Sequence, residues 1–186
     1  MSGALPVHES APIAILLGLR GSGKSTLAAG LATSLGRPWL DLDRAVLARL
    51  GVESVEEAFK RLGEPAFREA ESVSLIEALQ TPAVLSLGGG TPFVAGAREA
   101  IEDAKRRGSL VIWTDAPDPV LAARIAAGSD RPPLRGVDAA EEVATLRSER
   151  QRTYRALADL RIDTEAFPPA FAIEAIVRAL RDRGVA

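Results

Sequence analysis

Short runs of apolar residues alternate with longer segments of helical periodicity along most of the chain. The apolar runs are bounded by Gly, Pro or Asp, as buried strands are, and they cover residues 13–17, 39–40, 83–87, 110–113 and 160–162. Between them, apolar residues recur at the spacing i, i+3, i+4, which indicates amphipathic helices. These positions are Leu27, Leu31 and Leu35 in one helix, Phe67, Ala70, Val73, Leu75 and Leu79 in a second, and Ile173, Ile176, Val177 and Leu180 in the last. The alternation predicts an α/β fold in which helices cover both faces of a parallel sheet.

One segment interrupts this alternation. Residues 128–137 (GSDRPPLRGV) are polar and rich in Gly, Pro and Arg, and a single expected strand follows them. We therefore interpret them as a mobile loop within one domain rather than as a linker between two domains. The expected organisation is a single domain over residues 1–186, with a tail at residues 1–12 and a mobile lid at about residues 128–138.

Composition and charge exclude several classes of protein. Hydrophobic residues make up 47% and charged residues 26% of the chain, which favours a globular domain over a disordered one. No apolar run approaches the roughly 20 residues that a membrane-spanning helix needs, and residues 1–10 lack the pattern of a signal peptide. The net charge of −2 argues against a nucleic-acid-binding surface. We expect a cytoplasmic protein with no membrane and no nucleic-acid partner.

Three residue types narrow the chemistry further. The chain has no cysteine, which excludes disulfides, thiolate metal sites and cysteine nucleophiles. Its one histidine is His8, so a Ser-His-Asp triad and a histidine metal cluster are excluded as well. The lysines are Lys24, Lys60 and Lys105 alone, because nearly all of the basic residues are arginines. A lysine that stands inside a motif is therefore informative.

A phosphate-binding motif follows the first apolar run. Residues 18–25 read GLRGSGKS and match the pattern G-x-x-x-x-G-K-[ST] between an expected strand and an expected helix, which is the context this motif requires. Glycines let backbone N–H groups surround a phosphate, and the helix N-terminus adds a positive dipole. The lysine of such a motif reaches the β- and γ-phosphates, and its serine hydroxyl coordinates Mg²⁺. The predicted nucleotide-binding residues here are Gly18, Gly21, Ser22, Gly23, Lys24, Ser25 and Thr26.

Two carboxylates, Asp41 and Asp43, stand at the end of the second apolar run (WLDLDR). Ligands gather at the carboxyl ends of strands in an open parallel sheet, and alternate residues of a strand share a face, so both side chains can point toward the phosphate site. One carboxylate would help to hold Mg²⁺, and the other would accept a proton from an attacking hydroxyl group. The structural alternative is that one of them caps a helix that starts near Arg44.

Three glycines, Gly88, Gly89 and Gly90, follow the third apolar run. They would let backbone amides approach a ligand closely, and the alternative is a plain tight turn. No aspartate ends this strand, so a metal ion must find its carboxylate elsewhere. Asp41 is the best candidate, and together with Ser25 it forms the predicted Mg²⁺ site.

Together, these motifs resemble those of the shikimate kinase family. The P-loop is followed in order by D-L-D at 41–43, F-R-E-A-E at 67–71, G-G-G at 88–90 and R-P-P-L at 131–134, and the resemblance runs from about residue 13 to residue 163. It implies a three-layer P-loop fold of the nucleoside-monophosphate-kinase kind, with a five-stranded parallel sheet and a mobile lid. It also implies transfer of the ATP γ-phosphoryl group to the 3-hydroxyl of shikimate, with Mg²⁺ as cofactor, ATP and shikimate as ligands, and a monomeric protein.

The resemblance also assigns residues to the acceptor. Asp43 would contact the shikimate hydroxyls and activate the attacking one. Arg68 would bind the shikimate carboxylate, with Glu71 orienting it. Gly89 and Gly90 would lie with their backbone against the substrate.

Three further arginines are assigned in the same way. Arg131 matches the lid arginine that reaches the transferred phosphate, so the predicted catalytic residues are Lys24, Asp43 and Arg131. Arg124 matches an arginine that lies against the adenine. Arg150 matches the second carboxylate-binding arginine, although the chain reads R-Q-R-T-Y where the family usually reads R-x-P-L-Y. This departure leaves Arg152 as an alternative, and we favour Arg150 because its spacing to Tyr154 is kept.

Two other functions compete with this one. A related small-molecule kinase such as a gluconate kinase would act on another hydroxy acid, but the retained F-R-x-x-E, D-x-D and G-G-G motifs favour shikimate. A non-catalytic, kinase-like ligand sensor would be expected to carry a fused DNA-binding module and to lose catalytic residues. Residues 1–12 leave no room for such a module, and Lys24, Asp43 and Arg131 all remain. We therefore expect an ATP-dependent shikimate kinase.

Overall fold

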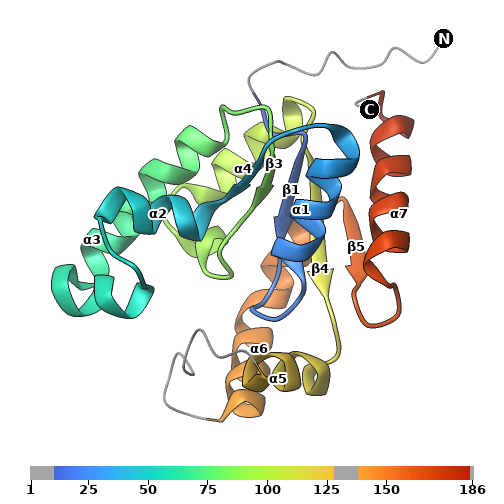
Figure 1. Ribbon diagram of the computed structural model, residues 1–186. Helices are drawn as coiled ribbons and strands as arrows, with labels where there is room; N and C mark the ends of the chain where they lie inside the picture. Colours follow the sequence, from blue (N-terminus) through green and yellow to red (C-terminus); the bar gives the residue numbers. More distant parts are fainter. Residues whose placement is uncertain (1–10, 128–137, 185–186) are drawn as a thin grey trace.

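A parallel sheet runs through the middle of the protein (Figure 1). The computed structural model describes residues 11–127 and 138–184. Within them, the sheet has five strands in the order β2-β3-β1-β4-β5, and every neighbouring pair is parallel. The strands are β1 (Ala14–Leu17), β2 (Trp39–Asp41), β3 (Val84–Ser86), β4 (Leu110–Asp115) and β5 (Leu160–Asp163). The predicted α/β class and five-stranded parallel sheet are confirmed.

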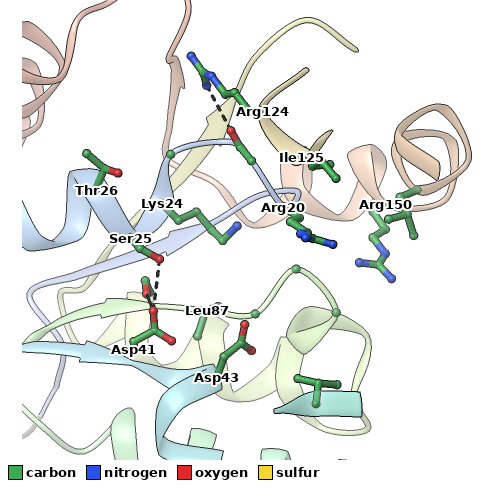
Figure 2. A pocket seen from close by; sticks show the side chains of 18 of the residues that line it. Arg20, Lys24, Ser25, Thr26, Asp41, Asp43, Leu87, Arg124, Ile125 and Arg150 are labelled. Atoms are coloured by element: carbon green, nitrogen blue, oxygen red, sulfur yellow. Dashed lines mark hydrogen bonds between the residues drawn. The ribbon is translucent and has the colours of Figure 1, made fainter. Parts of the chain in front are cut away.

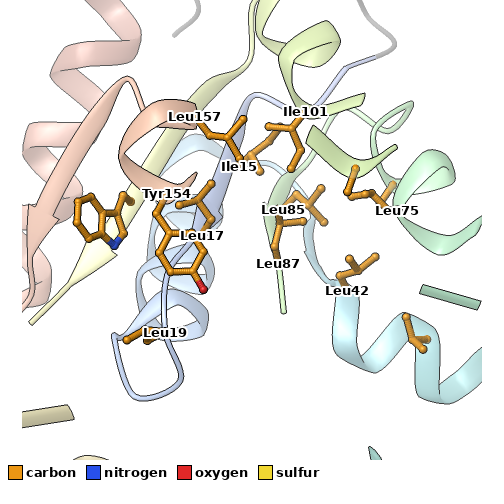
Figure 3. Packing of buried hydrophobic residues seen from close by; sticks show 14 of the residues in the cluster. Ile15, Leu17, Leu19, Leu42, Leu75, Leu85, Leu87, Ile101, Tyr154 and Leu157 are labelled. Atoms are coloured by element: carbon orange, nitrogen blue, oxygen red, sulfur yellow. The ribbon is translucent and has the colours of Figure 1, made fainter. Parts of the chain in front are cut away.

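Side chains on the two faces of β1 build two separate cores. Ile15 and Leu17 point into the core that α2 to α6 share, whereas Ala14 and Leu16 point into the core that α1 and α7 share. Figure 3 shows Ile15 and Leu17 among the side chains of the first core. Strands that are buried on both faces read as continuous apolar runs rather than as alternating patterns, which is why the sequence shows them clearly.

Helices cover both faces of the sheet, as the alternating pattern predicted. Helix α1 (Lys24–Leu35) and α7 (Pro169–Asp182) lie side by side on one face (Figure 1). The other core is closed by helices whose bounds are α2 (Leu42–Leu50), α3 (Val55–Ala78), α4 (Ala97–Arg106), α5 (Asp118–Ala127) and α6 (Ala139–Leu157). A short 3-10 helix, η1 (Thr91–Phe93), lies between β3 and α4. Helix α1 ends at Gly36 in the left-handed conformation, as expected from its position in the sequence.

Helix α3 is broken near its middle and buries a different stripe from the one expected. Gly63 has φ 82° and ψ 162°, which are not helical values, and Pro65 follows it. Val73 was expected on the apolar face, but it is 42% exposed. The buried positions of the second half of α3 are Phe67, Ala70, Glu71, Ser74, Leu75 and Ala78. Two polar residues thus lie on the buried face, which a hydrophobic pattern cannot indicate.

The expected tail and lid are only partly within the described residues. Ala11 and Pro12, which the sequence places in the tail, are buried, and the Ser109 hydroxyl donates a 2.6 Å hydrogen bond to the Pro12 carbonyl. Asp138 caps α6 by accepting a 2.7 Å hydrogen bond from the Ala140 N–H. Residues 1–10 and 128–137, and with them the lid and Arg131, lie outside the described residues. No helix of the described part of the chain is long and apolar enough to cross a membrane.

Candidate active site

A cavity of about 850 Å³ opens at the carboxyl ends of the strands. Its walls come from the β1–α1 loop, the start of α2, α3, the β3–η1 loop, α5, α6 and the β5–α7 loop. Figure 2 shows side chains from the β1–α1 loop, the start of α2, α5 and α6 around this cavity. Open parallel sheets place their ligand sites at this end of the strands.

The β1–α1 loop, where the sequence predicts phosphate binding, lies at one side of the cavity. Gly23 lies in the left-handed conformation (φ 84°) and α1 begins at the next residue, with no side chain capping its first turn. The N–H groups at the start of a helix point along its axis, and the helix dipole favours negative charge there. The ammonium group of Lys24 donates a 2.8 Å hydrogen bond to the Leu19 carbonyl across the loop. This hydrogen bond holds a positive charge beside the loop.

The predicted nucleotide residues divide into two groups. Gly21, Gly23, Lys24, Ser25 and Thr26 line the cavity. Gly18 and Ser22 instead pack against β4. A Cβ atom at Gly18 would come within 2.2 Å of the Thr114 carbonyl oxygen, so the close approach of the loop to β4 requires glycine there. The Ser22 hydroxyl is buried and lies 2.8 Å from the Thr114 hydroxyl.

Asp41 fits both interpretations that the sequence left open, with a different oxygen for each. Its Oδ1 accepts a 3.2 Å hydrogen bond from the Arg44 N–H and caps α2. Its Oδ2 accepts 3.3 Å hydrogen bonds from the hydroxyls of Ser25 and Ser86 (Figure 2 draws the Ser25 bond). Carboxylate and hydroxyl oxygens are the ligands that Mg²⁺ takes in phosphoryl-transfer sites. The described residues hold no group of three or more acidic or histidine side chains around one point, so a metal here would also need phosphate and water oxygens.

Asp43 faces the cavity from a helix rather than from a strand. Strand β2 ends at Asp41, and Asp43 lies in the first turn of α2, so the expected alternation along a strand is wrong. The helical turn nevertheless brings both carboxylates to the cavity wall. A Cβ atom at Gly88 would lie 2.4 Å from Oδ1 of Asp43. Gly88 therefore gives the Asp43 carboxylate the space it occupies.

Arg68 reaches the cavity from α3 and is held by a buried carboxylate. Its Nη1 donates a 2.8 Å hydrogen bond to Oε2 of Glu71, whose Oε1 accepts a 2.7 Å hydrogen bond from the Thr91 hydroxyl. Burial lowers the pKa of the Arg68 guanidinium, but the hydrogen bonds and charges of Glu71 and Glu64 outweigh burial and raise this pKa above its ordinary value. Arg68 is thus a permanent cation at the cavity wall.

Arg150 and Tyr154 reach the site from α6. Arg150 lines the cavity with its guanidinium 5.5 Å from the centre of the Phe93 ring, whereas Arg152 is exposed and is not part of the wall. The Tyr154 phenol donates a 2.6 Å hydrogen bond to the Gly89 carbonyl. Burial raises the pKa of Tyr154 to about 12, against the charge and hydrogen bond of Arg150, which lower it. Tyr154 is therefore a neutral donor that fixes the glycine loop.

A buried ion pair fixes α6 one turn before Arg150. Arg147 lies 3.0 Å from the Asp115 carboxylate at the end of β4, and it also pairs with Asp118. Burial lowers the pKa of Arg147, but the Asp118 and Asp115 carboxylates outweigh burial and raise it. Asp115 is 2% exposed and takes Arg161 as a second partner at 2.9 Å. Removing one member of such a buried network leaves an uncompensated charge, so the network holds α6 firmly.

Arg124 fastens the β1–α1 loop to the loop after β5. Its Nη1 donates to the Gly21 carbonyl at 3.2 Å (Figure 2) and to the Thr164 hydroxyl at 2.8 Å. Its Nη2 donates to the Thr164 carbonyl at 3.0 Å. Phe167 and Pro169, which follow Thr164 in the sequence, also line the cavity. The side chain predicted to lie against adenine therefore also holds the loop that would bind the phosphates.

Comparison with known proteins identifies the family. A family model described as shikimate kinase matches residues 20–181. The shikimate kinase of Corynebacterium glutamicum is 35% identical over 169 residues, which are 91% of this chain and 96% of that protein. The shikimate kinase of Rhodopirellula baltica is 40% identical over 154 residues, which are 80% of each chain. The chain belongs to the shikimate kinase family.

Solved structures agree with this membership. The shikimate kinase from Acinetobacter baumannii in complex with shikimate matches with a TM-score of 0.83 and 27% identity, over 96% of this chain and 97% of that one. The shikimate kinase from Aquifex aeolicus matches with a TM-score of 0.71 and 30% identity, over 92% and 97%. A gluconokinase from Sinorhizobium meliloti shares the fold alone, with a TM-score of 0.51 and 15% identity over 94% and 95%.

The function of the chain is that of a shikimate kinase, an ATP-using enzyme, which confirms the function predicted from the motifs. The structure brings the predicted residues Asp41, Asp43, Arg68, Arg150 and the glycine loop to one cavity. Prediction from sequence gave no role to Arg20, Glu64 and Ser86, which line the cavity, or to Tyr154, which donates to the Gly89 carbonyl. Arg20 occupies a variable position of the P-loop motif and lines the cavity. Its place inside that motif is the feature of the sequence that could have indicated this.

Proposed function

We propose that the chain transfers the γ-phosphoryl group of ATP to the 3-hydroxyl group of shikimate and yields shikimate 3-phosphate and ADP. The observation that carries this proposal is the cavity itself. Its wall carries Lys24 of the P-loop, the two guanidiniums of Arg68 and Arg150, and the carboxylate of Asp43. A nucleoside triphosphate beside a small hydroxylated carboxylate fits these groups, because both ligands are anions and the acceptor carries hydroxyl groups.

The nucleotide end follows from the P-loop. The N–H groups at the start of α1 would bind the β-phosphate, and Lys24 would exchange its hydrogen bond to Leu19 for the β- and γ-phosphates. Ser25 and Asp41 would hold Mg²⁺, which supplies charge neutralisation on the phosphate oxygens when it is bound. Arg124 would lie against the adenine. Arg131 remains a prediction for the transferred phosphate, because it lies outside the described residues.

The acceptor end orients the attacking hydroxyl. Arg68 and Arg150 would bind the carboxylate of shikimate, and the backbone of Gly89 and Gly90 would lie against its ring. Asp43 would accept the proton of the 3-hydroxyl as that oxygen forms its bond to the γ-phosphorus. The bond from the γ-phosphorus to the bridging oxygen breaks with its electron pair on ADP, so that charge and atoms balance.

Measurement of ADP release tests the proposal. The assay compares shikimate with quinate, gluconate and a reaction without acceptor, each at saturating ATP and Mg²⁺. We expect rapid ADP release with shikimate and a low rate with the other three. ADP release with gluconate and none with shikimate would overturn the proposed acceptor. A second measurement, light scattering of the purified protein, tests the monomer that we propose on the basis of the family.

A further inference from the structure

Arg68 holds a second carboxylate besides Glu71, and the proposed mechanism gives that carboxylate no role. The Nε and Nη2 atoms of Arg68 both donate to Oε1 of Glu64, at 3.3 and 3.1 Å. Glu64 and Arg68 both line the cavity. The Nε and Nη2 atoms form one of the edges on which a guanidinium binds carboxylates with two parallel hydrogen bonds. Glu64 therefore takes, in the free chain, an edge of Arg68 that a bound carboxylate would use.

The two carboxylates on Arg68 differ in burial. The Glu71 side chain is 4% exposed and is also held by Thr91, so it is a fixed part of the wall. The Glu64 side chain is 62% exposed, and that of Arg68 is 40% exposed. An ion pair this open to water is weak, because solvent screens both charges and competes for both groups. Glu64 can therefore be replaced on Arg68 at little cost, whereas Glu71 cannot.

The backbone beside Glu64 allows such a replacement. Glu64 directly follows the break in α3 at Gly63, where φ is 82° and ψ is 162°, and Pro65 comes next. Arg68 and Glu71 stand in the second half of the helix, which is anchored through its buried stripe. Glu64 can turn away from Arg68 without moving the part of α3 that carries the carboxylate site.

We propose that Glu64 occupies Arg68 in place of the substrate carboxylate and that shikimate displaces it on binding. This inference rests on the proposed function, because it takes Arg68 as the carboxylate site. Exchange of one carboxylate for another on the same cation gives a small net gain. Every acid that binds Arg68 must displace Glu64, so Glu64 lowers the affinity of each of them by the same small factor. Shikimate gains its further affinity from contacts at Asp43 and the glycine loop. Glu64 thus sets the affinity of the carboxylate site by competing for Arg68.

The test measures the dissociation constant of shikimate by titration calorimetry. Glu64→Gln and Glu64→Ala are compared with the wild-type protein and with Glu69→Gln, which changes an exposed carboxylate on α3 that does not line the cavity. We expect both Glu64 variants to bind shikimate about 2- to 5-fold more tightly, and Glu69→Gln to match the wild type. The methyl ester of shikimate, which carries no charge, should bind equally to the wild type and to both Glu64 variants.

Two results would overturn this inference. Equal or weaker binding of shikimate by both Glu64 variants would make Glu64 a support for Arg68 rather than a stand-in for the substrate. An equal gain for shikimate and for its methyl ester would show that the effect does not run through the carboxylate. Failure of the wild-type protein to bind shikimate would instead overturn the proposed function, so the two failures are distinguishable.

Discussion

Gly88 and Asp43 are in such close contact that position 88 has no room for a side chain. A Cβ atom there would lie 2.4 Å from Oδ1 of Asp43 and 3.0 Å from the Thr91 hydroxyl oxygen. The backbone at Gly88 has no positive φ, so space and not conformation requires the glycine. The loop after β3 therefore determines where the Asp43 carboxylate can sit.

We predict that Gly88→Ala lowers kcat about 100-fold, because a displacement of about 1 Å at a reacting group costs that much. The fold should be retained, since the Asp43 side chain can rotate away from the added methyl group. Steady-state kinetics of Gly88→Ala, Asp43→Asn and the double variant check the mechanism of the loss. If Gly88 acts through Asp43, the double variant should be no slower than Asp43→Asn alone. Fully additive losses would contradict the account.

Glu71→Gln should raise the KM for shikimate several-fold and leave the KM for ATP unchanged. The variant removes the buried charge that holds Arg68 in place, while it keeps the shape and the acceptor for Thr91. Glu69→Gln, on the exposed side of the same helix, is the matched control. A change in the KM for ATP of equal size would mean that the buried carboxylate supports the whole cavity rather than the acceptor site.

Arg150→Ala should weaken shikimate binding about 10- to 150-fold, since it removes a charge-assisted hydrogen bond of about 1.5–3 kcal/mol. Arg152→Ala should have little effect, because Arg152 is exposed and is not part of the cavity wall. Kinetics of the two variants at saturating ATP check this prediction. A larger loss in Arg152→Ala would show that Arg152, and not Arg150, is the second arginine that binds the carboxylate.

Tyr154→Phe should lower the free energy of unfolding by about 1 kcal/mol at neutral pH, because it removes a buried hydrogen bond to Gly89. The pKa of Tyr154 is raised from 10.0 to about 12 in the folded protein, so the phenol is worth most while it is protonated. Its contribution is complete below about pH 10 and is lost as the pH rises through about 12. Urea unfolding of both proteins at pH 7, 9 and 11 measures this difference. A difference that grows between pH 9 and 11 would contradict the assignment.

The features that could be predicted from the sequence are those encoded by residues close together along the chain. Strands β1, β3 and β4 are buried along their whole length, and apolar runs mark them in the sequence because strands covered on both faces carry mainly apolar side chains, whereas β2 and β5 are only partly buried. The P-loop is contiguous, so its position between β1 and α1 follows from the pattern. The sequence left open whether one of Asp41 and Asp43 caps a helix, and Asp41 does so through one oxygen while its other oxygen accepts from Ser25, where the Mg²⁺ site is predicted.

The contacts that shape the site could not be predicted in this way. Gly88 meets Asp43, and Tyr154 meets Gly89 at a separation of 65 residues, so neither contact leaves a local pattern. The exposure of Val73 could not be predicted from the pattern either. Glu71 and Ser74 occupy buried positions on α3 instead, where they accept hydrogen bonds from Arg68, Thr91 and Arg49. Polar residues that serve a site interrupt the periodicity on which helix prediction depends.

The product of the reaction tests the central claim most directly. The protein is incubated with shikimate, ATP and Mg²⁺, and the mixture is followed by phosphorus NMR with coupling to protons. The account predicts one new phosphate monoester whose phosphorus couples to the proton on carbon 3 of shikimate, together with an equal amount of ADP. The same mixture with Asp43→Asn should form this product at a small fraction of the wild-type rate. A phosphate on another hydroxyl, or ADP formed without any phosphorylated shikimate, would contradict it.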